Sequence, residues 1–370
     1  MKLLFAIKQL SGAVGGAERV LCMVCNGLVA KGHEIVLYSC DAPNSESFYE
    51  LDSRVKWVRL NLGEPSKPAS FFQTLKRMFF LRKAVSVESP DVVIGFMHSM
   101  FVPLSLCLIG KRIPVIGSEH IVPEHYKTRL GQYFLFLLST PFLSQITVLS
   151  ESIKKRYLSV IRNKMVVMPN PVKQPNRVST TAVLAPNRLL TVGRLEEQKD
   201  HKTLIQAFSL IAERFPDWHL KIVGEGALEN DIRKLINDLE VNERVVLSGF
   251  TSNIDLEYRE ADIFVIPSRY EALGLVTAEA MSHGLPSVGF IDCPGTNEII
   301  EHRVTGILVE PESDRAKALA DEMQSLMSNE SLRKQLGQKA KLNIQGKYSL
   351  SVIAKKWEKL LLSNCKSGNV

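Results

Sequence analysis

The opening of the chain follows one repeating pattern of apolar and polar positions. A short apolar run at 2–7 leads into a glycine-containing loop at 9–16, and helical periodicity follows over 17–32, where Gly32 ends it. A second apolar run occupies 34–40. Strand, loop, helix and strand in this order predict a right-handed β-α-β unit of a parallel sheet.

The same alternation continues in two series that are separated by a break. Further strand-like runs of the first series lie at 91–96, 114–120, 146–150 and 165–172. The strand-like and helical segments of the second series lie at 188–193, 201–215, 219–224, 227–241, 244–250, 262–268, 277–284 and 286–291. Between the two series, 173–187 has polar and proline-rich turns with little periodicity, which predicts an inter-domain linker.

We therefore predict an α/β fold with two doubly wound, Rossmann-like domains and a helical end from 314 onward. A chain of 370 residues is long enough for two cores. The first domain is expected to span 1–171, joined by a final helix at about 350–370, and the second to span 172–349. Ligands of such sheets bind beyond the carboxyl ends of the strands, so two such edges can face each other across a cleft.

Two uncharged stretches, 92–110 and 130–150, approach the length of a membrane span. Prolines and polar residues interrupt both. The first divides into a strand and a helix, and the second into a helix that ends near Pro141 and a strand, so both are expected in the core. The amino-terminal apolar run is interrupted by Lys8, which is not typical of a secretory signal.

Composition adds a preference for an anionic partner. The formal charge is +7, which suits a nucleotide, a phosphorylated lipid, a membrane surface or a nucleic acid, and does not choose among them. The six scattered cysteines are typical of reduced thiols in the cytoplasm. Cys22 and Cys25 form a C-x-x-C inside a predicted helix, and no second pair completes a zinc site, so buried thiols are expected.

The most informative segment runs from a strand expected to end near Pro267 to a helix expected to begin near Leu275. Gly284 and Pro286 stop that helix. The N–H groups at a helix start lack intrahelical partners and carry partial positive charge, so they suit a phosphate. Gly274 lets the backbone approach such a ligand closely.

Two carboxylates flank this helix start. Glu271 lies in the loop before the helix, and Glu279 lies more than a turn inside it. The two side chains need not touch, and they can address different parts of one ligand. The alternative is a pair of solvated surface glutamates, which is the usual environment of this residue type.

Several short motifs favour a ligand site over solvated surface glutamates, because together they resemble a known family. Glu271 and Glu279 have seven residues between them, an E-x7-E motif, and GGAER, SEH, PNPV, VGRLEEQKD, CPGTNEII and TGILVE occur in this order along the chain. Together they resemble the family-four retaining glycosyltransferases of the GT-B fold, of the bacterial surface-polysaccharide or lipopolysaccharide type. The resemblance extends along nearly the whole chain. It implies two Rossmann-like domains that face each other across a cleft, with C-terminal helices.

The resemblance also implies a donor site in the second domain. Arg194 and Lys199 would grip the diphosphate of a nucleotide-sugar. A guanidinium and an ammonium stabilise the charge of this leaving group without a metal, and no D-x-D motif indicates a metal-dependent enzyme. Glu271 would bind hydroxyls of the donor sugar, and Glu279 the ribose. The backbone amides expected near sugar and phosphate are those of Leu273, Gly274 and Leu275.

The first domain is expected to contribute a loop and a histidine. By the resemblance, the amides of Gly15 and Gly16 meet the donor phosphate, and His120 contacts the donor sugar near the reacting carbon. A histidine at this position is otherwise a structural residue. Retention is thought to keep leaving group and nucleophile on the same face. No carboxylate nucleophile or general base is therefore assigned, and the diphosphate itself is expected to accept the proton.

The function implied by the resemblance is that of a hexosyltransferase. It would move a hexose or N-acetylhexosamine from a nucleotide-sugar, preferably UDP-linked, to a glycan or lipid-linked acceptor in cell-surface polysaccharide or lipopolysaccharide synthesis. No cofactor beyond the donor substrate, no metal and no nucleic-acid partner is expected.

Two basic stretches bear on the acceptor and on location. Both 71–85 and 152–164 mix basic with aromatic or aliphatic residues. The basic residues of the first are Lys76, Arg77, Arg82 and Lys83. Such a stretch either lies on an anionic membrane or packs on the sheet with a solvated basic face. A peripheral position at the inner face of the cytoplasmic membrane would suit a lipid-linked acceptor.

Three other classes stay open. A nicotinamide-dependent oxidoreductase also has a glycine loop after its first strand and an acidic residue after its second, here Asp41, but the loop from Gly12 reads G-A-V-G-G-A rather than G-x-G-x-x-G. A nucleic-acid-binding or scaffold protein fits the charge, although no recognised motif is present. Another GT-B enzyme, such as a sugar-nucleotide epimerase or a phosphorylase, is the nearest alternative.

Overall fold

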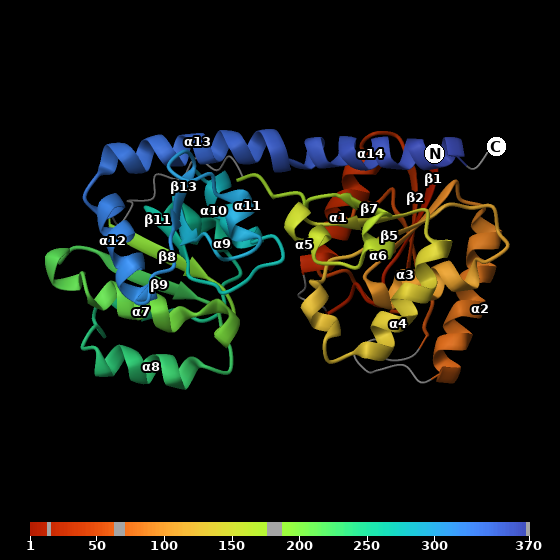
Figure 1. Cartoon of the computed structure of the whole chain (residues 1–370). Coiled ribbons are helices and arrows are strands. Elements are labelled where there is room, and N and C mark those ends of the chain that lie inside the picture. The colour runs from red at the N-terminus through yellow and green to blue at the C-terminus, as the bar shows by residue number, and fades with distance from the viewer. Residues whose placement is uncertain (13–15, 63–70, 176–186, 368–370) are drawn as a thin grey trace. The chain divides into compact units, whose positions relative to one another are not determined.

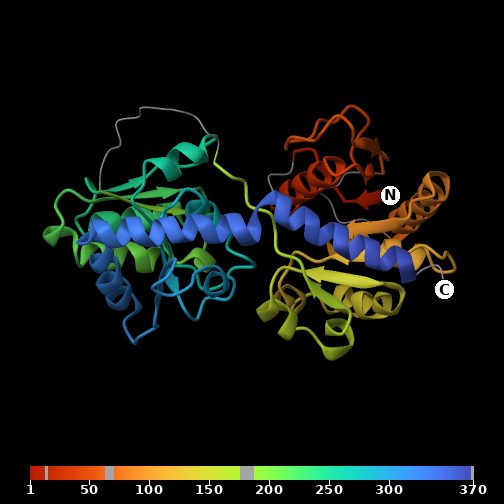
Figure 2. The same cartoon turned by 90° about the horizontal axis from the view of Figure 1, so that it is seen from above.

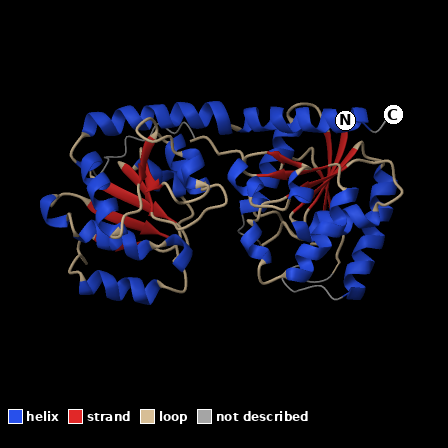
Figure 3. Ribbon diagram, in the orientation of Figure 1, coloured by secondary structure: helices blue, strands red, loops and turns tan. Residues whose placement is uncertain are grey.

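The chain forms two compact units, which we describe one at a time (Figure 1). The computed structural model describes residues 1–12, 16–62, 71–175 and 187–367. The first unit consists of Met1–Pro171 and Leu350–Val370, and the second of Val172–Ser349. Each has a parallel sheet with helices packed around it (Figure 3), which confirms the predicted α/β fold of two Rossmann-like domains. Most of the expected linker, 176–186, lies outside the described residues.

The sheet of the first unit has, within the described residues, the strand order β3-β2-β1-β4-β5-β6-β7. Its strands are β1 (Lys2–Ala6), β2 (Glu34–Ser39), β3 (Lys56–Arg59), β4 (Val92–Phe96), β5 (Val115–Ser118), β6 (Gln145–Val148) and β7 (Met165–Val167). In the centre, Phe5 of β1 lies opposite Leu37 of β2 and Ile94 of β4. The strand order reverses between β1 and β4, and ligands of doubly wound sheets bind at such a switch point.

The helices of the first unit follow the strands in alternation. They are α1 (Gly16–Val29), α2 (Phe71–Glu88), α3 (His98–Cys107), η1 (Pro123–Tyr126), α4 (Leu130–Ser139), η2 (Thr140–Phe142), α5 (Glu151–Lys155), α6 (Ser159–Arg162) and α14 (Leu350–Ser367). The two uncharged stretches form β4 with α3 and α4 with β6, as expected. Among the described residues, no helix has the length and apolar character that a membrane crossing requires.

The last helix of the chain completes the core of the first unit. Helix α14 contacts α1 and β4 (Figures 1 and 2). A Cβ atom on Gly27 of α1 would come within 3.1 Å of Ala354 Cβ, so the absence of a side chain there lets the two helices approach closely. Trp357 is buried and packs against Phe5 and Phe96, with ring centroids 6.4 and 6.1 Å apart. This helix therefore joins residues at the two ends of the chain.

The sheet of the second unit has, in the part of the chain described, the order β10-β9-β8-β11-β12-β13. Its strands are β8 (Arg188–Val192), β9 (His219–Val223), β10 (Val245–Leu247), β11 (Ile263–Ile266), β12 (Ser287–Phe290) and β13 (Gly306–Val309). All of the strand pairs are parallel. The loops that follow β8, β9 and β11 therefore emerge at the same edge of the sheet, from adjacent strands.

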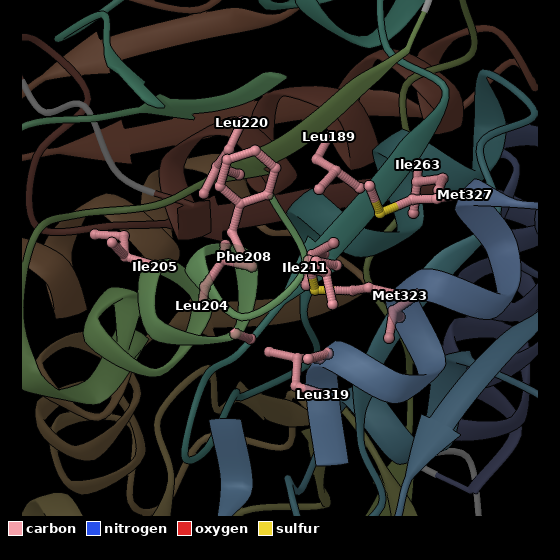
Figure 4. Packing of buried hydrophobic residues seen from close by; sticks show 14 of the residues in the cluster. Leu189, Leu204, Ile205, Phe208, Ile211, Leu220, Ile263, Leu319, Met323 and Met327 are labelled. Atoms are coloured by element: carbon pink, nitrogen blue, oxygen red, sulfur yellow. The ribbon is translucent and has the colours of Figure 1, made fainter. Parts of the chain in front are cut away.

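Helices of the second unit bury the apolar side chains of this sheet. They are η3 (Glu197–Lys199), α7 (His201–Ser209), η4 (Ala212–Arg214), α8 (Glu229–Asp238), α9 (Ile254–Arg259), α10 (Leu275–Ser282), α11 (Thr296–Ile299), α12 (Arg315–Met327) and α13 (Glu330–Tyr348). Figure 4 shows Phe208 of α7 and Met323 of α12 in one cluster with Leu189 and Leu220 of the sheet. This core fixes the β8–α7 connection.

The sequence patterns missed three local features. The helix expected over 201–215 ends at Ser209, and the apolar periodicity continues through the buried Ile211 into a separate 3₁₀ turn, η4. The basic stretch 152–164 forms two short helices, α5 and α6, and no continuous amphipathic helix. Strand β3 was not predicted, because only four half-buried or exposed residues form it at the edge of the sheet.

Candidate active site

The centre of the candidate site is an ion pair between two loops of the second unit. Lys199 belongs to η3, after β8, and Glu271 to the loop after β11. The distance from Lys199 Nζ to Glu271 Oε1 is 2.7 Å, and the two side chains are only 13% and 9% exposed. The structure thus joins one cation expected to bind phosphate to one carboxylate expected to bind sugar.

Further contacts tie the same two loops together. Arg269 N donates to Gln198 O at 2.9 Å, and Gln198 Nε2 donates to Tyr270 O at 2.8 Å. Arg269 Nε lies 2.7 Å from Oδ2 of Asp200, the residue between η3 and α7. Because backbone and side chains both take part, the β8–α7 and β11–α10 loops form one continuous wall at the sheet edge.

A glycine of the CPGTNEII segment packs directly behind Glu271. Glu271 N donates to Pro294 O at 2.9 Å. Gly295 has a φ of 83°, and a Cβ atom there would come within 2.5 Å of Glu271 O. Only glycine combines this backbone conformation with this close approach. The segment therefore holds the loop that carries Glu271 in place.

The start of α10 has the geometry expected for phosphate binding. Gly274 adopts the left-handed conformation, with φ 66° and ψ 49°, and no side chain caps the helix. The amides of Thr277 and Ala278 donate to Gly274 O, so the helix hydrogen bonds begin there. Leu275 is the first helical residue, and Leu273 is buried beside it. The leading N–H groups of α10 supply partial positive charge at the sheet edge.

Glu279 lies in the second turn of α10 and is separate from the Lys199–Glu271 pair. Its Oε2 accepts a hydrogen bond from the Tyr258 hydroxyl at 3.2 Å. Glu271 and Glu279 are 7% and 6% exposed, so the interpretation of both as solvated surface residues is wrong. Their different partners agree with different roles toward a ligand.

Arg194 differs from Lys199 in its surroundings. Its side chain is 70% exposed and pairs with Glu196 Oε1 at 2.9 Å. The loop that carries it packs against the turn after β9, because Leu195 N donates to Glu225 O and a Cβ atom on Gly226 would collide with the backbone of Leu195. The guanidinium therefore projects from a well-anchored backbone.

In the first unit, His120 follows β5 and is half-buried. Its Nε2 lies 2.9 Å from Ser118 Oγ, which accepts a hydrogen bond from Thr147 Oγ1 at 2.9 Å. The imidazole stacks on Phe96 with centroids 5.0 Å apart. Burial lowers the pKa of His120 to about 4, so the ring is neutral at pH 7. When Ser118 donates its proton to Nε2, Nδ1 carries the N–H and can donate to a ligand.

The neighbouring Glu119 is a buried carboxyl. It accepts hydrogen bonds from the Tyr126 hydroxyl at 2.6 Å and from Ile121 N at 3.0 Å. Burial nevertheless raises the pKa of Glu119 to about 7, because these bonds offset only part of the cost of desolvation. Glu119 holds the β5–η1 connection behind His120.

Of the two glycines expected in the first-domain loop, Gly15 lies outside the described residues, and Gly16 is the first residue of α1. Asp41, the acidic residue of the oxidoreductase alternative, is buried. Its carboxylate accepts hydrogen bonds from Leu10 N at 2.8 Å and from the amide and hydroxyl of Ser11. These bonds bind the carboxylate to the chain itself, which weakens that alternative.

The described residues contain no cluster of three or more His, Cys, Asp and Glu side chains arranged to hold a metal ion. The C-x-x-C thiols are buried within α1, as expected, and burial raises the pKa of Cys22 to about 11. Reasoning from sequence missed Arg269, Tyr258 and Gly295. The proline–glycine turn around Gly295 was the available signal, since such dipeptides mark special backbone geometry.

The similarity to known proteins extends over both units. Residues 172–343 match the family described as Glycosyl transferases group 1, and residues 14–174 match Glycosyltransferase Family 4. An uncharacterized glycosyltransferase of Haemophilus influenzae is 27% identical over 362 residues, which are 95% of this chain and 97% of the relative.

Two further proteins are similar over their whole length. The GalNAc-α-(1→4)-GalNAc-α-(1→3)-diNAcBac-PP-undecaprenol α-1,4-N-acetyl-D-galactosaminyltransferase of Campylobacter jejuni is 28% identical over 367 residues, 98% of each chain. Sucrose-phosphate synthase from Thermosynechococcus elongatus has a similar fold, with a TM-score of 0.80, 18% identity and 99% of each chain covered.

Proposed function

The chain belongs to the family 4 and group 1 glycosyltransferases of the GT-B fold, and we propose that it transfers a sugar with retention of anomeric configuration. The donor is a UDP-linked hexose or N-acetylhexosamine. The acceptor is a glycan or lipid-linked glycan in cell-surface polysaccharide or lipopolysaccharide synthesis. The Lys199–Glu271 pair in the loops before α7 and α10 carries this proposal.

The charge that drives the reaction comes from Arg194, Lys199 and the start of α10. Cleavage of the sugar–phosphate bond leaves negative charge on the diphosphate. The Lys199 ammonium has three N–H donors, and Glu271 takes one of them, so the others can bind phosphate. Arg194 is exposed and pairs with Glu196 at the surface, which is a weak contact, so the guanidinium can exchange it for a phosphate.

The two carboxylates bind different parts of the donor in this proposal. Glu271, fixed by Lys199, binds hydroxyls of the sugar, and Glu279, fixed by Tyr258, binds the ribose. The amides of Leu273, Gly274 and Leu275 meet sugar and phosphate. Neither carboxylate is proposed as a nucleophile, since the departing diphosphate can accept the proton of the acceptor hydroxyl on the same face.

The first unit contributes the amides of Gly15 and Gly16 and the imidazole of His120 in this proposal. The neutral state of His120 supports the role, because a neutral ring with Nε2 bound to Ser118 can donate from Nδ1 to a sugar oxygen. No cofactor or metal is included in the proposed reaction.

The choice of substrates is supported by one relative. The Campylobacter jejuni protein is named for transfer of N-acetylgalactosamine to a diphosphate-undecaprenol-linked glycan. At 28% identity over 98% of both chains, a similar class of donor and acceptor is a reasonable first choice for this chain.

A position at the inner face of the cytoplasmic membrane is also proposed, with α2 and α4 as the contact surface. Exposed apolar side chains on α2 include Phe72 and Phe79, and those on α4 include Leu130 and Phe134. Lys76 and Lys83 of α2 are exposed as well. The exposed apolar and cationic side chains suit an anionic membrane surface. Two other basic residues of α2 are held by the fold and are not part of this membrane surface, since Arg77 and Arg82 donate to the backbone oxygens of Leu62, Cys107 and Ile109.

The donor site is tested by thermal stabilisation with a panel of nucleotide-sugars. A ligand of the folded state raises the melting temperature by mass action. We expect one UDP-sugar to stabilise the wild type and to stabilise Arg194→Ala much less. Arg233→Ala is the control, because Arg233 is also an exposed arginine paired with a glutamate. No stabilisation by any nucleotide-sugar, or equal stabilisation of both variants, contradicts the proposal.

Product analysis separates transfer from the neighbouring reactions. Incubation with the stabilising nucleotide-sugar and no acceptor would give an epimeric nucleotide-sugar from an epimerase. With inorganic phosphate and a glycan, a phosphorylase would release a sugar phosphate. We expect neither product, and a new glycosidic bond of unchanged anomeric configuration only when an acceptor is added.

A further inference from the structure

The first unit contains a cavity of about 560 Å³ that has no assigned role. Its lining residues include Lys8, which follows β1, Cys40, which follows β2, and His98, which follows β4. These are adjacent strands of the sheet, and the order reverses between β1 and β4. The cavity therefore lies at the carboxyl edge of the sheet and at its switch point, which is where ligands of this architecture bind.

The walls of the cavity are aliphatic. Helices α2, α3 and α4 supply them, and Leu81, Met78 and Leu106 are examples. Leu81 is 2% exposed, so the inner wall belongs to the core of the unit. A cavity of this size with apolar walls is typical of a site for a small molecule with a hydrocarbon portion.

Two cations line the same cavity. Arg77 donates two N–H groups to Leu62 O, at 3.0 and 2.8 Å, which holds the guanidinium in place. Burial, and in second place the charge of Arg77, lower the pKa of Lys8. No Asp or Glu is among the described residues of the lining. The charged side chains of the described lining are therefore cations, which favour an anion.

One ring nitrogen of His98, Nδ1, adds a polar atom without a hydrogen-bond partner among the described residues. This nitrogen is buried. Burial lowers the pKa of His98 to about 4, so the ring is neutral at pH 7. A buried polar atom without a partner is costly unless a ligand or water completes its hydrogen bond.

Exposed leucines lie at the rim of the cavity. Leu75 of α2 is 45% exposed and Leu135 of α4 is 48% exposed, and both line the cavity. They continue into the exposed apolar side chains of the same two helices, such as Phe79 and Leu138. Both helices therefore present apolar side chains at the rim of the cavity and on the outside of the unit.

We infer that this cavity binds a lipid phosphate, with the aliphatic chain between α2, α3 and α4 and the phosphate on Lys8 and Arg77. The combination of aliphatic walls, paired cations and a lining without carboxylates matches the two parts of such a molecule. The inference rests on the proposed glycosyl transfer only in naming this lipid as the carrier of the acceptor sugar.

The test is calorimetric titration of the full chain with farnesyl diphosphate, a lipid phosphate that dissolves without vesicles. We expect saturable binding that is at least tenfold tighter than that of inorganic diphosphate, which has only the head, or of farnesol, which has only the chain. Lys8→Met and the cavity-filling Met78→Trp should each weaken it tenfold or more. Lys76→Met is the control, since Lys76 is exposed on α2 outside the lining, and it should bind as the wild type does.

The result that overturns the inference is binding no tighter than that of the two fragments, or wild-type binding in both cavity variants. Stabilisation by the UDP-sugar is measured in the same variants. Loss of farnesyl diphosphate binding with donor stabilisation kept shows that the cavity variants are folded and supports the cavity site. Farnesyl diphosphate binding without any donor stabilisation supports the cavity and contradicts the proposed function instead.

Discussion

The ammonium of Lys199 lies 2.7 Å from Glu271 Oε1, although the two residues are 72 positions apart in the chain. Both side chains are largely withdrawn from solvent, so neither charge is well solvated without the other. The pair therefore has two consequences, one for stability and one for chemistry, and variants of the two residues can separate them.

We predict that Lys199→Met and Glu271→Gln each lower the free energy of unfolding by about 3 kcal/mol, because each leaves a buried charge without its partner. The double variant should recover most of this loss, since no unpaired charge remains. Urea unfolding of the four proteins measures the cycle.

The same variants report on catalysis in a different way. Removal of a group that stabilises the leaving diphosphate is expected to reduce kcat by roughly a hundredfold or more. The double variant should therefore stay inactive although its stability is restored. Recovery of both stability and transfer in the double variant would show that the pair only supports the fold.

Replacement of Arg194 tests the donor site with little expected effect on stability. Its side chain is 70% exposed, so Arg194→Ala should change the unfolding free energy by no more than about 0.5 kcal/mol. We expect kcat/KM for transfer to fall roughly a hundredfold, because the exposed guanidinium no longer meets the diphosphate. Arg233→Ala, with a comparable surface pair, should retain full activity. Equal rates in the two variants would remove Arg194 from the donor site.

Sequence patterns predicted the local structure around the site well. The strand that ends near Pro267, the loop with Glu271 and the helix that begins at Leu275 are all present, because apolar runs and glycine or proline signals are local. The pattern also placed Glu279 more than a turn inside that helix. These features need no knowledge of how strands are ordered.

Sequence patterns could not predict the contacts between these loops. Lys199 meets Glu271 because β8 and β11 are neighbours in the sheet, and no local pattern encodes this order. The burial of Glu271 and Glu279 could not be predicted for the same reason. It depends on hydrogen-bond partners from other segments of the chain, such as Tyr258. Sequence composition alone favoured solvated carboxylates, which the packing overrides.

Gly295 links backbone conformation to the site. Alanine at this position would adopt a strained φ of 83° and bring its Cβ within 2.5 Å of Glu271 O, so we expect the loop of Glu271 to shift. Gly295→Ala should lose about 1 to 3 kcal/mol of unfolding free energy and most of its transfer activity. Gly110→Ala is a matched control, because Gly110 has the same φ and open space around it. Similar activity losses in both variants would show that strain alone is responsible.

Membrane attachment through α2 predicts a loss of vesicle binding when its apolar side chains are removed. Phe72 and Phe79 are 81% and 67% exposed, so Phe72→Ser with Phe79→Ser should leave the fold intact. We expect the wild type to sediment with anionic vesicles at low salt and the variant to remain in the supernatant. Leu342→Ser is the control, because Leu342 is an apolar side chain that is 61% exposed on α13 of the other unit. Binding of all three proteins to the same extent would place the contact elsewhere.

Glu119 gives the chain a pH-dependent stability that one substitution should remove. Its pKa is about 7 in the folded protein and about 4.5 when unfolded, so between these values the folded state holds more protons. The unfolding free energy therefore falls as pH rises through this window, by about 3 kcal/mol in total from this group.

Glu119→Gln should eliminate that contribution while keeping its contacts. The amide oxygen can accept from Ile121 N, and the amide nitrogen can donate to the Tyr126 hydroxyl. Relative to the wild type, we expect the variant to gain stability steadily between pH 5 and pH 8, as measured by urea unfolding at several pH values. The buried histidines change stability in the same way in both proteins, so the difference isolates Glu119. A stability difference that is constant with pH would mean that Glu119 is already ionised throughout this range, and that its hydrogen bonds outweigh the cost of its burial.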